Sequence, residues 1–275
     1  MTDWESFGEK VWEVFTKATV STGTVLVLIG CFVLLAAILQ LTTMTLRRKW
    51  FDLLGERSWT VLAAPGTIVH ETGHALFCLI FRHRIVEIKL FSPSPDGTLG
   101  YVNHSWDPKS VYQRTGNFFI GTGPIVSGAL LITLATMLLM PEIWEQLQSP
   151  VCCTAGDMAA GVVSVICRML RVLMEKELWT RWQSYVWLLL ILLIGSHMTL
   201  SRSDLKNAGS GAVLLPIVIF IISLVLVFVC DPVELVMKYG NCVLVCAMAL
   251  MIFIIIVLGV FTLLLSLPVF HSGKH

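Results

Sequence analysis

The chain has 275 residues, of which 56% are hydrophobic and only 13% are charged, whereas soluble domains carry about 25% charged residues. This composition excludes an ordinary soluble protein and predicts an all-α membrane protein, a polytopic helical bundle that lies in a lipid bilayer. The net charge of +1 argues against a nucleic-acid partner, because no basic stripe is present to neutralise phosphates.

The first 21 residues predict an amphipathic helix on the membrane surface. In residues 1–19, Trp, Phe and Val recur at helical spacing opposite acidic residues and lysine. The segment does not read as a signal peptide, because it has no basic n-region and the apolar run after it is too long. Residues 22–58 are expected to form the first transmembrane helix and a basic loop.

Apolar runs that are long enough to cross the hydrocarbon core of a bilayer occur six times. They cover residues 22–46, 59–81, 118–140, 182–200, 212–230 and 242–270. We therefore expect about six transmembrane helices. The second to fourth of these fall within residues 59–211, and the last two form a C-terminal unit over residues 212–275.

The second run contains the most informative motif of the chain, His70-Glu71-Thr72-Gly73-His74. On a helix the two histidines lie on one face, so both rings can bind one metal ion while Glu71 lies beside them. Zinc held in this way lowers the pKa of a bound water to about 7, and the glutamate can act as the general base. Ionisable residues are rare inside membrane helices and usually mark a functional site. The motif predicts hydrolysis of a peptide bond.

One helical turn before the motif, Pro65 and Gly66 are expected to loosen the helix near the site. After the helix, residues 85–91 alternate in polarity, a Pro- and Gly-rich turn follows, and residues 98–103 resume an extended pattern. This predicts a β-hairpin over residues 85–103. A strand edge there could hold a substrate in the extended form that cleavage requires, or the hairpin could be an inert cap.

The third apolar run begins with a Gly-Thr-Gly-Pro sequence. Small residues at Gly123 and Ser127 would allow another helix to approach closely. Residues 141–181 do not read as a simple loop, because an apolar stretch there is interrupted by Arg168 and Arg171. We expect an interfacial or partly re-entrant helix in this segment.

A third metal ligand must come from elsewhere in the chain, and the end of the fourth run offers two candidates. Asp204 is the first choice. His197 lies seven residues earlier on a similar helical face, so it competes as a ligand or as a group that orients a ligand. Residues 207–211 contain two glycines, and this flexible backbone could form the broken segment that brings Asp204 to the depth of the histidines.

Together, the HETGH motif in a membrane helix, the hairpin, the Gly-Thr-Gly-Pro sequence and the later Ser-Asp-Leu segment resemble the site-2 protease family of intramembrane zinc metallopeptidases. The resemblance covers about residues 59–211 and is closest to small, divergent bacterial members. It implies a multi-pass protein of a bacterial cell membrane whose substrate is a membrane protein or peptide. It also implies that His70, His74 and Asp204 bind zinc and that Glu71 activates water.

Two non-catalytic alternatives use the same residues. A divalent-metal transporter would need further polar residues along a path through the bilayer, and the last two apolar runs contain almost none. A pseudoprotease that holds metal and binds membrane partners as a scaffold would differ in not depending on Glu71.

Overall fold

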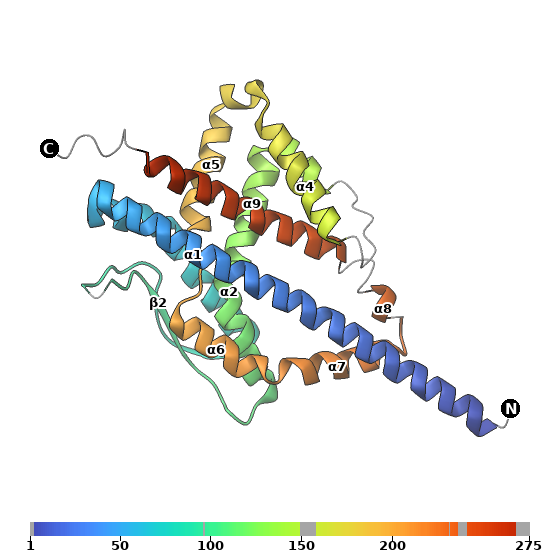
Figure 1. Cartoon of the computed structure of the whole chain (residues 1–275). Coiled ribbons are helices and arrows are strands. Elements are labelled where there is room, and N and C mark those ends of the chain that lie inside the picture. The colour runs from blue at the N-terminus through green and yellow to red at the C-terminus, as the bar shows by residue number, and fades with distance from the viewer. Residues whose placement is uncertain (1–2, 96, 149–157, 231, 236–240, 268–275) are drawn as a thin grey trace.

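A computed structural model describes residues 3–95, 97–148, 158–230, 232–235 and 241–267. Most of these residues are helical (Figure 1). The helices are α1 (Asp3–Ile80), α2 (Val111–Leu139), α3 (Pro141–Gln148), α4 (Met158–Leu173), α5 (Trp182–Gly195), α6 (Arg202–Ala212), α7 (Leu215–Leu226), α8 (Pro232–Leu235) and α9 (Asn241–Leu265), with a 3-10 helix at Lys176–Thr180.

The longest helix, α1, crosses the whole molecule and packs against α2, α7 and α9 (Figure 1). The expected surface helix and first membrane helix are therefore parts of one continuous helix. In place of the expected basic loop, residues 47–58 stay helical except at Gly55, where φ is 78° and ψ is 169°. Such angles favour glycine, because a Cβ would clash there. The bend thus occurs at Gly55, whereas Pro65 lies inside the helix.

Three helical segments of the described chain are long and apolar enough to cross a membrane: Gly8–Leu53, Val111–Leu139 and Val245–Leu265. A fourth crossing is possible if Arg202–Ala212 and Leu215–Leu226, which are bent by 46° relative to each other, count as one broken span. The six spans expected from the apolar runs are thus not confirmed. The expectation counted apolar residues, whereas α5 has only 14 residues and α7 only 12, fewer than the roughly 20 that a crossing needs.

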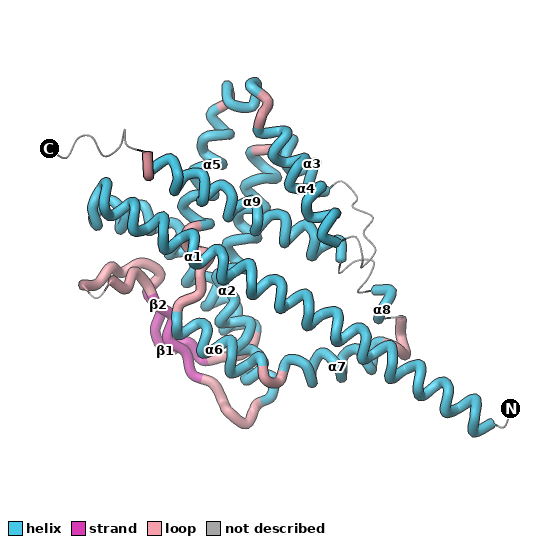
Figure 2. The backbone as a smooth tube through the Cα atoms, in the orientation of Figure 1, coloured by secondary structure: helices cyan, strands magenta, loops and turns pink. Residues whose placement is uncertain are grey.

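The predicted hairpin is confirmed as an antiparallel pair of β1 (Arg84–Lys89) and β2 (Tyr101–Ser105), the magenta strands in Figure 2. Ile88 lies opposite Val102, and Ile85 lies opposite His104. The register shifts between Ile85 and Glu87, as at a β-bulge. The hairpin follows directly on α1 and packs against it.

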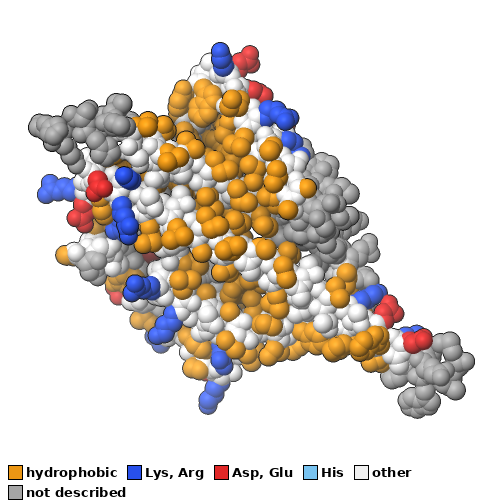
Figure 3. Space-filling model, in the orientation of Figure 1, with side chains coloured by type: hydrophobic (Ala, Val, Ile, Leu, Met, Phe, Trp, Pro, Cys, Tyr) orange, Lys and Arg blue, Asp and Glu red, His pale blue; other side chains and the backbone are white. Residues whose placement is uncertain are grey.

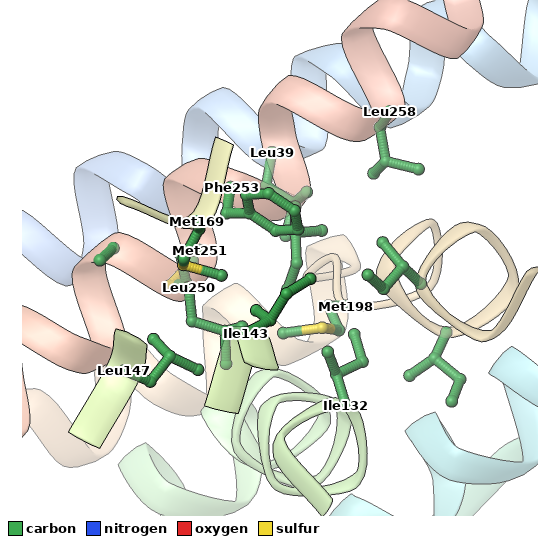
Figure 4. Close-up of a cluster of buried hydrophobic side chains, with 14 of the residues drawn as sticks. Leu39, Ile132, Ile143, Leu147, Met169, Met198, Leu250, Met251, Phe253 and Leu258 are labelled. Atoms are coloured by element: carbon green, nitrogen blue, oxygen red, sulfur yellow. The ribbon is translucent and has the colours of Figure 1, made fainter. Parts of the chain in front are cut away.

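A single cluster of buried apolar side chains joins α9 to α1, α2, α3, α4 and α5. Phe253 and Leu258 of α9 lie in this cluster together with Leu39 of α1 and Ile132 of α2 (Figure 4). Met198, just after α5, belongs to it too and packs where a side chain on Gly128 would otherwise lie. The cluster includes Ile125 of α2 and Met198, which are close in sequence to the Gly-Thr-Gly-Pro segment and to Asp204.

The outer surface matches the composition. Figure 3 shows a broad hydrophobic area over the middle of one face, with charged side chains gathered towards its margins. This is the distribution expected of a helical protein surrounded by lipid.

Parts of four predicted segments lie outside the described residues. They are residues 1–2 of the N-terminal helix, 96 of the hairpin, 149–157 of the segment 141–181, and 231, 236–240 and 268–275 of the C-terminal unit with the end of the last apolar run. Within the segment 141–181, α4 is an amphipathic helix that packs against α3 and α9.

Candidate metal centre

The HETGH motif lies in the last part of α1, where α2 approaches unusually closely. A Cβ on Gly73 would lie 2.7 Å from the carbonyl oxygen of Gly123, and one on Gly123 would lie 2.8 Å from the carbonyl oxygen of Gly73. Ser127 Oγ donates a hydrogen bond of 3.0 Å to the carbonyl of Val69. The close approach predicted for Gly123 and Ser127 is confirmed, and the partner helix is the one that carries the motif.

Asp204 reaches the motif because α6 packs against α2 through glycines. A Cβ on Gly121 would lie 2.5 Å from the Asp204 carbonyl oxygen, and one on Gly211 would contact the backbone N of Phe118. The expectation that residues 207–211 supply a flexible break is wrong, since they are helical and the bend follows them at Val213 and Leu214. The glycines of this segment allow close packing, which brings the carboxylate to the histidines.

The structure brings His70, His74 and Asp204 together. The Nε2 atoms of the two histidines are 3.2 Å apart. Asp204 Oδ1 lies 3.2 Å from His74 Nε2, and Asp204 Oδ2 lies 3.6 Å from His70 Nε2. One ligand atom from each residue falls within 4.8 Å of the others, and the described residues hold no second group of this kind. The carboxylate is 6% exposed, so its charge needs a compensating cation.

Hydrogen bonds on the far side of each ring determine where the ring protons are. His70 Nδ1 lies 2.8 Å from the carbonyl oxygen of His197, and His74 Nδ1 lies 2.8 Å from the carbonyl oxygen of Ile120. A carbonyl only accepts, so each Nδ1 carries the hydrogen and each neutral ring has a lone pair at Nε2. When both rings are neutral these two lone pairs face each other, and either a metal ion bound between them or a proton on one ring beside Asp204 would relieve this arrangement.

The donor set fits zinc. Two imidazole nitrogens and a carboxylate are the ligands of a catalytic zinc site, which keeps its fourth position open. From Zn–N distances of about 2.0–2.1 Å, two nitrogens of a tetrahedral site lie about 3.3 Å apart, close to the 3.2 Å between the histidines. Backbone carbonyls that accept from the outer ring nitrogens are also typical of histidines that bind metal.

Glu71 lies beside these three residues, and all four residues line one cavity. The residue is 7% exposed. A Cβ on Gly100, in the hairpin, would lie 2.9 Å from Glu71 Cγ and 2.8 Å from the Leu90 carbonyl oxygen. Gly100 therefore lets the hairpin come close to the glutamate, and sequence reasoning did not single it out.

His197 contributes its backbone, not its ring, to the centre. Its carbonyl accepts from His70 Nδ1, whereas its ring stacks on Trp59 with centroids 5.6 Å apart. The ring also lies 2.9 Å through Nδ1 from the Leu193 carbonyl. Gly66 leaves the space for this ring, because a Cβ there would contact it. Of the two alternatives for His197, the geometry favours the residue that orients a ligand.

The centre opens into a cavity of about 600 Å³, within the usual range for ligand sites. Three parts of the chain line it: the HETGH face of α1, residues 98–104 with Trp106 around β2, and several residues of the segment 197–207, which leads into the first turns of α6. Many of its lining side chains are polar, among them Arg47, Thr67 and Asn103. A polar cavity of this size beside a two-histidine, one-carboxylate centre can admit water and a small ligand.

Comparisons of this chain with protein-family models, with curated proteins and with solved structures found no match.

Proposed function

We propose that this protein is an intramembrane zinc metalloendopeptidase that hydrolyses a peptide bond of a membrane-embedded or membrane-proximal substrate. The observation that carries the proposal is the convergence of three candidate ligands, with His70 Nε2 and His74 Nε2 3.2 Å apart and Asp204 oxygens 3.6 and 3.2 Å from them. Glu71 lies next to this group in a cavity large enough for a peptide segment. The long apolar helices support a location in the bilayer.

Zinc at this position would polarise a peptide carbonyl and lower the pKa of a water molecule. The residues of the chain supply the rest of the chemistry. The Glu71 carboxylate would take a proton from the attacking water and later deliver it to the leaving amine nitrogen. His70, His74 and Asp204 would hold the zinc. Hydrogen bonds to the backbone, on the side of each ligand that faces away from the metal, would keep these three side chains in place.

The hairpin supports an extended substrate. Residues 98–104 line the cavity next to the centre, and β2 pairs with β1. A peptide that pairs with a strand edge exposes its backbone, whereas a helical peptide keeps its peptide bonds covered. A substrate strand laid along this part of the hairpin would bring a peptide bond to Glu71.

The experiment compares wild-type protein with Glu71→Gln and with Glu56→Gln, a control that removes an exposed carboxylate of the same helix. All three are reconstituted in liposomes with a panel of labelled single-pass membrane peptides, and zinc content is measured in parallel. We expect Glu71→Gln to keep zinc and to lose cleavage by at least about 100-fold, the lower range for a general base. Cleavage retained by Glu71→Gln would contradict the mechanism. Zinc without cleavage in the wild type would favour the metal-holding scaffold.

A further inference from the structure

A second pair of imidazoles lies beside the cavity and is not used by the metal centre. His83, just after α1, is buried, and His104 is the fourth residue of β2. Their Nδ1 atoms are 3.1 Å apart and their ring centroids 5.0 Å. The Nε2 atom of His83 lies 2.9 Å from the backbone carbonyl oxygen of Gln113 in α2.

These contacts determine the tautomer of both rings. The Gln113 carbonyl can only accept, so His83 carries its hydrogen on Nε2 and has a lone pair on Nδ1. The 3.1 Å contact is then a hydrogen bond donated by His104 Nδ1. His104 is left with an unprotonated Nε2 on the opposite side of its ring. Unlike His70 and His74, this pair needs no cation between its nitrogens.

His104 lines the same cavity as Glu71 and His74. Burial, with smaller effects of His83 and His74, lowers the pKa of His104 to about 4, so its ring is neutral at pH 7. Among the described residues no group donates a hydrogen bond to its Nε2. His104, a residue that lines the cavity, therefore carries an acceptor that no described residue uses.

An extended peptide that enters this cavity brings N–H groups out of water, and each of them needs an acceptor. We propose that His104 binds the substrate by accepting a hydrogen bond at Nε2 from a peptide N–H, and that His83 is a positioning residue that holds His104 in the tautomer able to accept. This inference rests on the proposed peptidase function, and it assigns a substrate-binding role to a residue outside the HETGH motif.

Two substitutions separate this role from a purely structural one. His104→Asn retains a donor near the position of Nδ1, so it can still bond to His83, but it has no acceptor at the position of Nε2. His104→Gln can place an acceptor near the position of Nε2, but it gives up the ring contact with His83. A substrate-binding role predicts that Gln is the better replacement, whereas a role in supporting His83 predicts that Asn is.

The probes are two zinc-binding compounds, acetohydroxamate and the hydroxamate of N-acetyl-alanyl-leucine. Both bind a zinc ion through the hydroxamate, and only the second presents peptide N–H groups. Binding to the zinc-loaded, detergent-purified protein is measured by calorimetry. We expect His104→Asn to weaken the peptidyl compound roughly 3- to 10-fold, the range for one hydrogen bond, with acetohydroxamate unchanged. His104→Gln should bind the peptidyl compound within about 3-fold of wild type.

The outcomes separate this inference from the function on which it rests. If acetohydroxamate binds and His104→Asn binds the peptidyl compound as well as wild type does, the role of His104 is overturned and the metal centre stands. Equal weakening of both compounds by His104→Asn overturns it too, because the effect would then be on the centre. If neither compound binds wild-type protein, the zinc centre is contradicted and this inference with it.

Discussion

Asp204 Oδ2 accepts a hydrogen bond of 2.7 Å from the backbone N–H of Ser201, and Ser201 Oγ accepts one of 3.2 Å from the backbone N–H of Asp204. The two residues form the capping box that begins α6. The same carboxylate faces His70 and His74. The start of α6 and the geometry of the candidate ligand set therefore depend on one pair of residues.

Ser201→Ala tests this dependence. It removes the side-chain cap, which costs about 1 kcal/mol of stability, and it loosens the backbone that orients Asp204. We expect zinc affinity to fall roughly 10-fold, the lower limit for residues that orient ligands, as measured by competition with a chelating dye. Ser210→Ala, at the other end of α6, is the control and should leave the affinity unchanged. Equal affinities in both variants would contradict the link between cap and centre.

The contact between Gly73 and Gly123 predicts a second effect. In Gly73→Ala the new Cβ would lie 2.5 Å from Ser127 Oγ and 2.7 Å from the Gly123 carbonyl oxygen, so α1 and α2 must separate. We expect the free energy of unfolding to fall by roughly 1–3 kcal/mol, which is typical of overpacking, and we expect zinc to bind more weakly. Gly30→Ala is the control on the same helix, because nothing lies within 4 Å of its Cβ; it should be neutral or stabilising by up to about 1 kcal/mol. Thermal unfolding in detergent measures the stability of the two variants, and similar unfolding midpoints for Gly73→Ala and Gly30→Ala would contradict the prediction.

The sequence predicts two of the three candidate ligands well. A spacing of four residues places His70 and His74 on one helical face whatever the rest of the fold does. The sequence leaves Asp204 and His197 as alternatives for the third ligand, because the position of Asp204 depends on α6 packing against α2 through Gly121 and Gly211. Contacts between segments so far apart in the sequence are not determined by local periodicity.

Local periodicity does not determine two other features, the number of spans and the pairing of His83 with His104. Apolar runs predict six spans, but a run of apolar residues does not fix the length of the helix within it, and α5 has only 14 residues and α7 only 12. The pairing of His83 with His104 follows from the register of the hairpin, which places His104 opposite Ile85. The hairpin itself was predicted, so its register is the signal that could have identified this pair.

His197→Phe separates the ring of residue 197 from its backbone. The carbonyl that accepts from His70 Nδ1 remains, and a phenyl ring can still stack on Trp59. We expect the variant to hold one zinc per chain with an affinity within about 3-fold of wild type, since no ligand or orienting bond is lost. Complete loss of zinc in a folded variant would show that the His197 ring is the third ligand.

The stability of the metal-free protein should depend on pH through His104. Burial, His83 and His74 lower the pKa of His104 from 6.5 to about 4, and burial lowers that of His83. Between about pH 6.5 and 4 the unfolded chain binds more protons at these rings, so stability falls as the pH falls through this window. We expect the unfolding midpoint of wild type to drop more than that of His104→Asn between pH 7 and pH 4.5 in the presence of chelator. If the unfolding midpoints of wild type and His104→Asn fall equally between pH 7 and pH 4.5, the expected contribution of His104 to the pH dependence is contradicted.

The proposed function depends most directly on the three-residue metal centre. The decisive measurement is zinc stoichiometry, by elemental analysis, of detergent-purified wild type, His74→Ala and Asp204→Ala, with Glu56→Gln as a control for the substitution of an exposed acidic residue. We predict one zinc per chain in wild type and in Glu56→Gln, and none in the other two variants. Absence of zinc from metal-replete wild type, or one zinc retained by Asp204→Ala, would contradict the centre described above.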